Sequence, residues 1–157
     1  MNPGFILGPS FIGAGFTSGD IIAKLMNNDY PGLPKIQMPV VDVRECATAH
    51  LEAIKKPEAA NRRFVLVAKS VWFKEIGQIL HNEFNPVGYK PTKSELPKWL
   101  ASLGSIFMNE LKQVLNEWNK IIILENTQSV QTLGIEYRPF EQTVKEMVLS
   151  MWETGAL

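Results

Sequence analysis

The sequence has 157 residues, and 45% of them are hydrophobic, which is enough for one ordinary core and predicts a single unit over residues 1–157. The 16 basic and 16 acidic residues balance, so nothing favours nucleic acid or an anionic membrane surface as a partner. The longest apolar runs, such as residues 121–124, are far shorter than the roughly 20 residues that cross a bilayer, and the chain start has no signal-peptide pattern. The single cysteine, Cys46, cannot form an internal disulfide, which indicates a reducing, cytoplasmic environment.

The first predicted element is a short strand at residues 5–7. Phe5, Ile6 and Leu7 form an apolar run between prolines and glycines, a pattern typical of a buried strand in a covered α/β sheet. A buried strand needs neighbours, so we expect this one to be a late strand of a larger sheet and the chain to be the back part of a longer fold. The free edge of the strand could pair with another copy, so we expect an oligomer or aggregation.

Strand and helix patterns alternate along the rest of the chain. Ser18 and Ser70 are the expected N-caps of two helices, while Asp42 and Glu45 have the spacing of a capping box. Gly134 is expected to end a short helix in the left-handed conformation. Strands are predicted at residues 36–41 and 64–67, and helices at residues 18–27, 43–55, 71–84, 97–118 with a break near Gly104, 127–133 and 140–153.

The apolar positions of the helix after Asp42 predict which of its faces is buried. Val43, Ala47, His50 or Leu51, and Ile54 fall at spacings of three and four, which place them on one side of a helix. We expect that side to face the core.

Four segments of the sequence carry a family resemblance: residues 2–10 (NPGFILGPS), 41–45 (VDVRE) with Ala49 and His50, 61–64 (NRRF) and 133–135 (LGI). Together they resemble the C-terminal part of the extended short-chain dehydrogenases/reductases, within the NAD-dependent epimerase/dehydratase superfamily. The closest resemblance is to the dihydroflavonol-4-reductase-like branch, which also contains ketone, aldehyde and methylglyoxal reductases. The resemblance implies an α/β fold made of the late strands of a Rossmann-like sheet and a mostly helical substrate-binding lobe, without the N-terminal dinucleotide-binding part.

Two motifs that carry the chemistry of this family have no match in the sequence. The glycines at positions 13 and 15 lack the third glycine and the acidic ribose partner of a phosphate-binding turn. Tyr89 has Lys93 at the offset of the catalytic Tyr-x-x-x-Lys pair, but Pro91 between them argues against the helix that this pair needs. We therefore assign no catalytic residue and expect that the chain alone does not bind the cofactor.

The resemblance implies eight site residues, all near the chain start or the capping box. Those expected at the cofactor are Pro3, Gly4, Ile6 and Ser18, and those expected at the substrate are Pro9, Ser10, Thr17 and Arg44. The alternative is that Pro3, Gly4 and Pro9 only shape the backbone, and the capping box explains Asp42 without any chemistry. Neither His50 nor His81 has a partner at metal-ligand spacing, so no metal site is predicted.

The residues and the family resemblance leave two functions open for this chain. The first is the substrate-binding portion of an NAD(P)H-dependent oxidoreductase that acts on a small-molecule carbonyl or secondary alcohol, with NADP or NAD as the cofactor of the parent family and no activity of this portion alone. The alternative is a non-catalytic module, a truncated pseudoenzyme, that binds a ligand or a protein.

Overall fold

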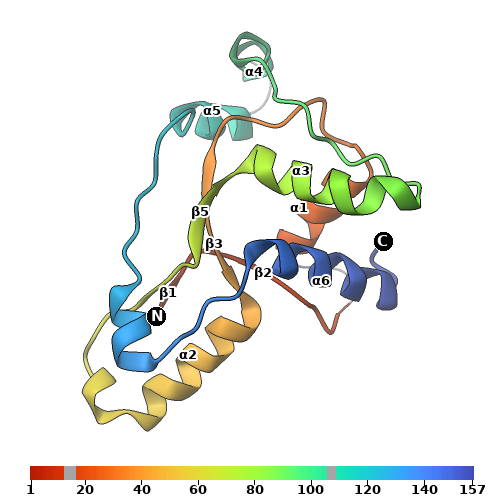
Figure 1. The fold of residues 1–157 in the computed structure, drawn as a ribbon. Helices are drawn as coiled ribbons and strands as arrows, with labels where there is room; N and C mark the ends of the chain where they lie inside the picture. Colours follow the sequence, from red (N-terminus) through yellow and green to blue (C-terminus); the bar gives the residue numbers. More distant parts are fainter. Residues whose placement is uncertain (13–16, 106–108) are drawn as a thin grey trace.

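A computed structural model describes residues 1–12, 17–105 and 109–157 of the chain (Figure 1). The glycines at positions 13 and 15 lie outside the described residues. Strands and helices follow one another in the order β1 (Asn2–Pro3), β2 (Phe5–Leu7), α1 (Thr17–Met26), β3 (Gln37–Asp42), α2 (Val43–Lys55), η1 (Pro57–Ala59), β4 (Val65–Leu66), β5 (Lys69–Trp72), α3 (Phe73–Phe84), η2 (Asn85–Val87), α4 (Lys98–Gly104), α5 (Asn109–Asn116), the π-helical turn η3 (Ser129–Leu133) and α6 (Phe140–Glu153).

Residues 2–7 form one extended segment that pairs with two different strands. Its first half, β1, is parallel to β4, with Asn2 opposite Val65. Its second half, β2, is parallel to β3, with Phe5 opposite Val40. In turn β3 pairs antiparallel with β5, so that the three-stranded sheet has the order β2-β3-β5 and β2 lies at its edge.

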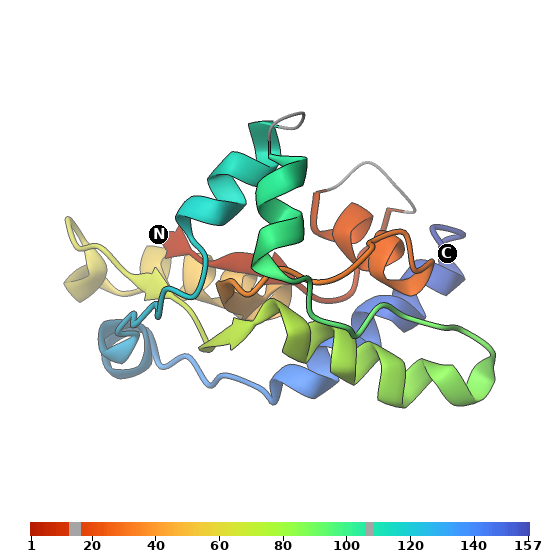
Figure 2. The same cartoon turned by 90° about the horizontal axis from the view of Figure 1, so that it is seen from above.

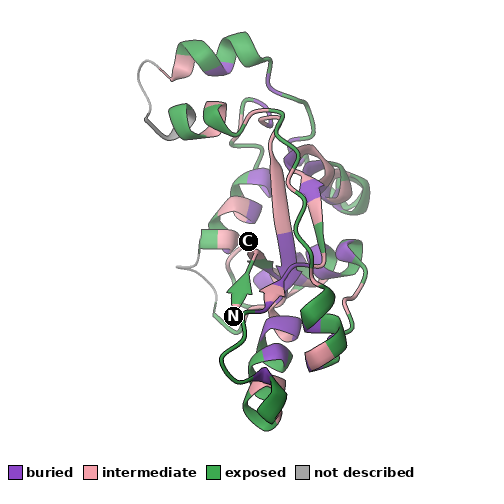
Figure 3. Cartoon of the chain, turned by 90° about the vertical axis from the view of Figure 1, so that its left-hand side faces the viewer, coloured by how far each residue is buried: buried purple, intermediate pink, exposed green. Residues whose placement is uncertain are grey.

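Helices cover this sheet unevenly. The main core is formed by side chains of α1, α3 and α6 that pack against the strands, and Figure 2 shows α3 and α6 on one side of the strands with α4 and α5 projecting on the other. A second, smaller cluster joins α2, Phe64 and η3. Figure 3 shows buried residues along the strands and the inner faces of the helices, whereas α4 and α5 are mostly exposed. Within the described part of the chain, no helix is long and apolar enough to cross a membrane.

The α/β fold class is confirmed, and most of the predicted elements are found within a few residues of their expected bounds. The capping box is present, because the Asp42 side chain accepts from the amide of Arg44 and the Glu45 side chain accepts from the amide of Asp42. Gly134 ends its helix with φ of 74°, as expected. The predicted helix at residues 97–118 is interrupted at Gly104, where α4 ends.

Two predicted helix caps, Ser18 and Ser70, are wrong. Helix α1 begins at Thr17, so Ser18 lies inside its first turn and does not cap it. Ser70 belongs to β5, a strand that the sequence did not indicate, because its four residues are too few to show a clear alternation. The helix after it starts at Phe73, and the Glu75 carboxylate accepts from the amide of Trp72 at 2.8 Å in place of a serine cap.

The predicted buried face of α2 is also wrong. Leu51 and Ile54 are 57% and 85% exposed, and the buried face of the helix holds Glu45, Cys46 and Ala49 instead. Glu45 lies inside because it accepts hydrogen bonds from the buried amide of Asp42 and the partly buried amide of Arg138, and the small residues on the same face let α2 approach its neighbours closely. The apolar stripe therefore points outward.

Candidate functional site

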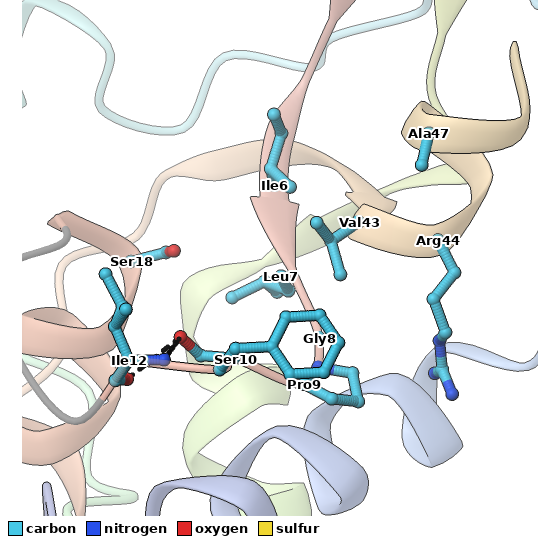
Figure 4. A pocket seen from close by; sticks show the side chains of 11 residues that line it. Ile6, Leu7, Gly8, Pro9, Ser10, Ile12, Ser18, Val43, Arg44 and Ala47 are labelled. Atoms are coloured by element: carbon cyan, nitrogen blue, oxygen red, sulfur yellow. Dashed lines mark hydrogen bonds between the residues drawn. The ribbon is translucent and has the colours of Figure 1, made fainter. Parts of the chain in front are cut away.

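A largely apolar pocket of about 450 Å³ lies where β2 ends (Figure 4). Its wall is built from the end of β2, the loop that follows, the first turn of α1 and the first turns of α2. The lining residues are Ile6, Leu7, Gly8, Pro9, Ser10, Phe11, Ile12, Ser18, Val43, Arg44 and Ala47. The carboxyl end of a strand in an α/β sheet is the usual place for a ligand, so the pocket is the candidate site of this chain.

The loop after β2 gets its shape from Gly8 and Ser10. Gly8 has φ of 120°, and a Cβ atom there would lie only 3.2 Å from the Asp42 carboxylate, so the backbone can turn at this point only with glycine. The Ser10 hydroxyl donates to the carbonyl of Ile12 at 3.0 Å, and the Ser10 amide donates to Ser150 Oγ at 3.0 Å. These contacts tie the pocket rim to α6 and leave Ile12 exposed toward the opening.

The pocket brings together five of the eight predicted site residues. Ile6, Pro9, Ser10, Ser18 and Arg44 all line it.

The other three predicted residues do not line the pocket. Pro3 and Thr17 are exposed. Gly4 lies against β3, and a Cβ atom at Gly4 would stand 2.4 Å from the carbonyl oxygen of Pro39. The close approach of two strands is therefore enough to require glycine at position 4.

Beside the pocket lies a cluster of charged side chains centred on the buried Asp42. Only 2% of Asp42 is exposed, and its carboxylate accepts from Arg44 Nε and Nη2 at 2.9 and 2.7 Å, from Arg138 Nη1 at 2.9 Å and from Thr143 Oγ1 at 2.8 Å. Arg44 also donates to Glu146 on α6. The cluster joins the start of α2 to α6 and to the segment before it, and it holds one wall of the pocket in place.

The cluster changes the acidity of its members. Burial alone would raise the pKa of Asp42, but hydrogen bonds from Arg44 and Thr143 outweigh it and lower the pKa from 3.8 to about 2. Burial raises the pKa of Glu45, although the amides of Arg138 and Asp42 act against it. The Arg44 guanidinium, hydrogen-bonded to Asp42, has a raised pKa and stays charged.

Arg44 has donors left over for a ligand. Three of the five N–H groups of its guanidinium reach Asp42 and Glu146, so each terminal nitrogen keeps one N–H without a partner among the residues that the structure describes. Its side chain is 39% exposed at the pocket wall. A polar group of a bound molecule could accept from it there.

The sequence contained no signal for Arg138, Thr143 or Glu146 as partners of this cluster. They lie about 100 residues after the capping box, and each belongs to a residue type that is common on surfaces. Only the packing of α6 against the start of α2 brings them together.

The lowered pKa of Asp42 predicts how stability depends on acidity. The pKa is lower in the folded than in the unfolded chain, so the ionised carboxylate stabilises the fold above about pH 4, and this contribution of about 2 kcal/mol is lost as the pH falls toward 2. The raised pKa of Glu45 acts in the opposite sense. Urea unfolding of the natural chain and of Asp42→Asn between pH 5 and 2 should show a steeper loss in the natural chain. Equal slopes would contradict the assignment.

Other candidate groups have structural roles. The Tyr89 hydroxyl accepts from Trp152 Nε1 at 3.0 Å, while Lys93 Nζ lies 2.7 Å from His81 Nε2, so the two residues do not form a helical pair. Cys46 is buried on α2, and burial raises the pKa of its thiol to about 11. Among residues 1–12, 17–105 and 109–157, no cluster of histidine, cysteine or acidic side chains could hold a metal ion.

The arrangement of these strands and helices is similar to that of the corresponding parts of solved reductase and epimerase structures. The structure of Gre2 of Candida albicans in complex with NADPH matches with a TM-score of 0.66 and 25% identity over 98% of this chain and 43% of its own. A nucleoside-diphosphate-sugar epimerase of Pseudomonas aeruginosa matches with a TM-score of 0.77 and 16% identity over 99% of this chain and 48% of its own. The resemblance drawn from the sequence is thereby confirmed.

Curated proteins also match over nearly the whole chain. Cinnamoyl-CoA reductase 2 of Arabidopsis thaliana is 27% identical over 157 residues, which are 100% of this chain and 41% of the plant protein. An NADPH-dependent methylglyoxal reductase of Saccharomyces cerevisiae is 24% identical over 152 residues, 93% of this chain and 40% of the yeast protein. This chain therefore spans about two fifths of the length of these relatives. No family model matches it.

Proposed function

We propose that residues 1–157 form a single unit that is the substrate-binding portion of an NADPH-dependent oxidoreductase acting on a carbonyl or a secondary alcohol. The observation that carries this proposal is the apolar pocket at the carboxyl end of β2, which five predicted site residues line. The names of the matching reductases support NADPH as the reductant and a carbonyl compound as the substrate class.

The residues of this chain fit one end of such a cofactor. The wall formed by Ile6 and Pro9 suits a flat, largely apolar ring, and a bound nicotinamide would supply hydride. The pyrophosphate needs a glycine-rich turn at a helix start, and the sequence holds no three-glycine match to one. We therefore expect the phosphates to be held outside this chain.

In this proposal the chain binds and orients the substrate. Ile6, Ile12 and Val43 exclude water from the apolar part of the substrate, which strengthens the electrostatic interactions at the reacting carbonyl. The free N–H groups of Arg44 hold a polar group of the substrate, and Asp42 acts as the positioning residue that keeps the guanidinium at the wall. The protein groups that move the proton of the reacting hydroxyl lie outside residues 1–157.

A fusion enzyme tests this proposal. The part of Candida albicans Gre2 that precedes its match to this chain is joined to residues 1–157, and NADPH oxidation is followed with small aldehydes. We expect turnover by the fusion and none by the unfused chain. Ile12→Asp places a hydrated charge at the rim of the apolar pocket, where the side chain is 57% exposed, and should lower kcat/KM by about 3- to 10-fold, because the apolar part of the substrate loses its contact with Ile12, worth roughly 0.7–1.4 kcal/mol.

Val87→Asp provides the matched control. Val87 is 63% exposed on η2 and does not line the pocket, so kcat/KM should stay unchanged. A folded fusion without turnover, or equal kinetics for Ile12→Asp and Val87→Asp, would contradict the proposed role.

A further inference from the structure

A second pocket, of about 470 Å³, lies at the start of β4. Its lining residues are Arg62, Arg63, Val65, Glu125, Thr127 and Gln128, and we call it the Arg62–Arg63 pocket. The strand β4 is parallel to β1, and β1 leads directly into β2, so the amino end of β4 and the carboxyl end of β2 face opposite ways. The Arg62–Arg63 pocket is therefore separate from the candidate site, and nothing in it depends on the function proposed above.

Both walls of this pocket are fixed to the body of the fold. The two arginines are followed at once by Phe64, which is 1% exposed and belongs to the smaller core cluster. On the other wall, the side-chain amide of Asn126 donates to the carbonyl of Val67 at 2.7 Å, just after β4. Two segments about 60 residues apart in the chain thus meet at the pocket, and a ligand there would not have to order the backbone first.

The two arginines carry positive charge that the described part of the chain does not neutralise. Neither forms an ion pair with a carboxylate of residues 1–12, 17–105 or 109–157. Arg62 is oriented by two weak contacts, since its guanidinium carbon lies 5.8 Å from the centre of the Phe64 ring and its Nη1 donates to Thr132 Oγ1 at 3.4 Å. Most N–H groups of the two guanidinium groups are left for a ligand.

The opposite wall can form hydrogen bonds with hydroxyl groups. Glu125 offers carboxylate oxygens, Thr127 a hydroxyl and Gln128 an amide, and none of these side chains has a hydrogen-bond partner among the described residues. Glu125 is the one acid in the lining, so the two arginines leave a net positive charge. An anionic group would be attracted to the arginines and repelled by Glu125, whereas a neutral hydroxyl could donate to that carboxylate.

We propose that the Arg62–Arg63 pocket binds a small sugar phosphate. The guanidinium groups hold the phosphate oxygens with charge-assisted hydrogen bonds, for which the planar fork of arginine is well shaped. The side chains of Glu125, Thr127 and Gln128 bind the hydroxyl groups of the sugar. The volume lies in the range of small-molecule sites, and the charged lining suits a hydrophilic ligand, unlike the apolar wall of the candidate site.

The experiment titrates the 157-residue chain with inorganic phosphate, glucose and glucose 6-phosphate at constant ionic strength, and reads calorimetry and amide NMR shifts. Free phosphate shares the chemistry of the phosphate group, so the comparison shows whether the sugar is held as well. We expect glucose 6-phosphate to bind at least about 10-fold more tightly than inorganic phosphate, and glucose not to bind. The amide shifts should change at Arg62, Arg63 and Gln128 and stay constant around the candidate site.

Substitutions at Arg63 separate the shape of the guanidinium from its charge. Arg63→Lys keeps the charge and loses the fork, so it should weaken glucose 6-phosphate binding by about 3- to 10-fold, and Arg63→Gln should weaken it more. Lys98→Gln removes one positive charge from α4, outside the pocket, and should leave the affinity unchanged. Arg63 and Lys98 are both exposed, so the melting temperature should not change and lost binding cannot be attributed to unfolding.

Glu125→Ala should act on the two phosphate probes in opposite directions. Inorganic phosphate should bind more tightly, because a like charge is removed from the lining. The advantage of glucose 6-phosphate over inorganic phosphate should shrink, because the sugar loses an acceptor for its hydroxyl groups. An equal gain for both probes would show that the pocket attracts anions without holding the sugar, which overturns the assignment.

Three further outcomes would overturn the inference. The first is a folded chain that binds neither phosphate probe, or binds both equally. The second is a loss of affinity in Lys98→Gln as large as that in Arg63→Gln, which would mean that only the overall charge matters. The third is sedimentation with phosphatidic acid vesicles that Arg63→Gln abolishes, in a chain that does not bind glucose 6-phosphate, since a lipid headgroup would then be the source of the phosphate.

Discussion

Replacing Asp42 by alanine is expected to lower the free energy of unfolding by about 3–5 kcal/mol, because it removes the buried carboxylate to which two arginines and a threonine donate. The carboxylate is almost fully buried and accepts from Arg44, Arg138 and Thr143 at 2.7–2.9 Å. Alanine would leave the Arg138 guanidinium, whose side chain is 30% exposed, without its closest anion. Urea unfolding at pH 7 measures the change.

A surface ion pair provides the control for this substitution. Lys145 and Glu83 lie 2.7 Å apart with about half of each side chain exposed, so Lys145→Ala should change the free energy of unfolding by less than about 1 kcal/mol. If Asp42→Ala cost as little as Lys145→Ala, the cluster would not be what joins α2 to α6.

Replacing Gly4 by alanine is the second substitution with a large expected effect. The new Cβ would stand 2.4 Å from the carbonyl oxygen and 2.9 Å from the carbonyl carbon of Pro39, and backbone atoms cannot move aside as a flexible side chain can. The strand at residues 2–7 must shift away from β3, at a cost of about 2–3 kcal/mol. At about 2–4 °C for each kcal/mol in a chain of this size, we expect the melting temperature to fall by about 4–12 °C.

Gly155→Ala separates this clash from backbone strain. Gly155 has φ of 72° with nothing within 4 Å of the added Cβ, so alanine there costs only the left-handed conformation, about 1–2 kcal/mol. If Gly4→Ala melts at the same temperature as the natural chain, the contact with Pro39 is not tight. The requirement for glycine at position 4 would then need another cause, such as contact with a ligand.

Short-range patterns predicted much of this fold correctly. The capping box depends only on Asp42 and Glu45, which are three positions apart, and the end of the helical turn at residues 129–133 depends on Gly134 in the left-handed conformation. Both features could therefore be predicted from a few neighbouring residues. Ser70 shows the limit of such patterns, since a serine that could have capped a helix was drawn into β5 by pairing with Pro39 of β3.

The sequence by itself determined the alternation of strands and helices, the family resemblance and the apolar segment that borders the pocket, because periodicity, caps and turn residues act over a few positions. Only the tertiary structure decided that Arg138, Thr143 and Glu146 lie around Asp42 and Arg44. The reason is that α6 and the segment before it pack against the start of α2, which lies about 100 residues earlier in the chain. It also decided which face of α2 is buried. Apolar spacing marks a face that favours contact, but the hydrogen bonds that Glu45 accepts from the amides of Asp42 and Arg138 hold the opposite face inward and leave Leu51 and Ile54 exposed.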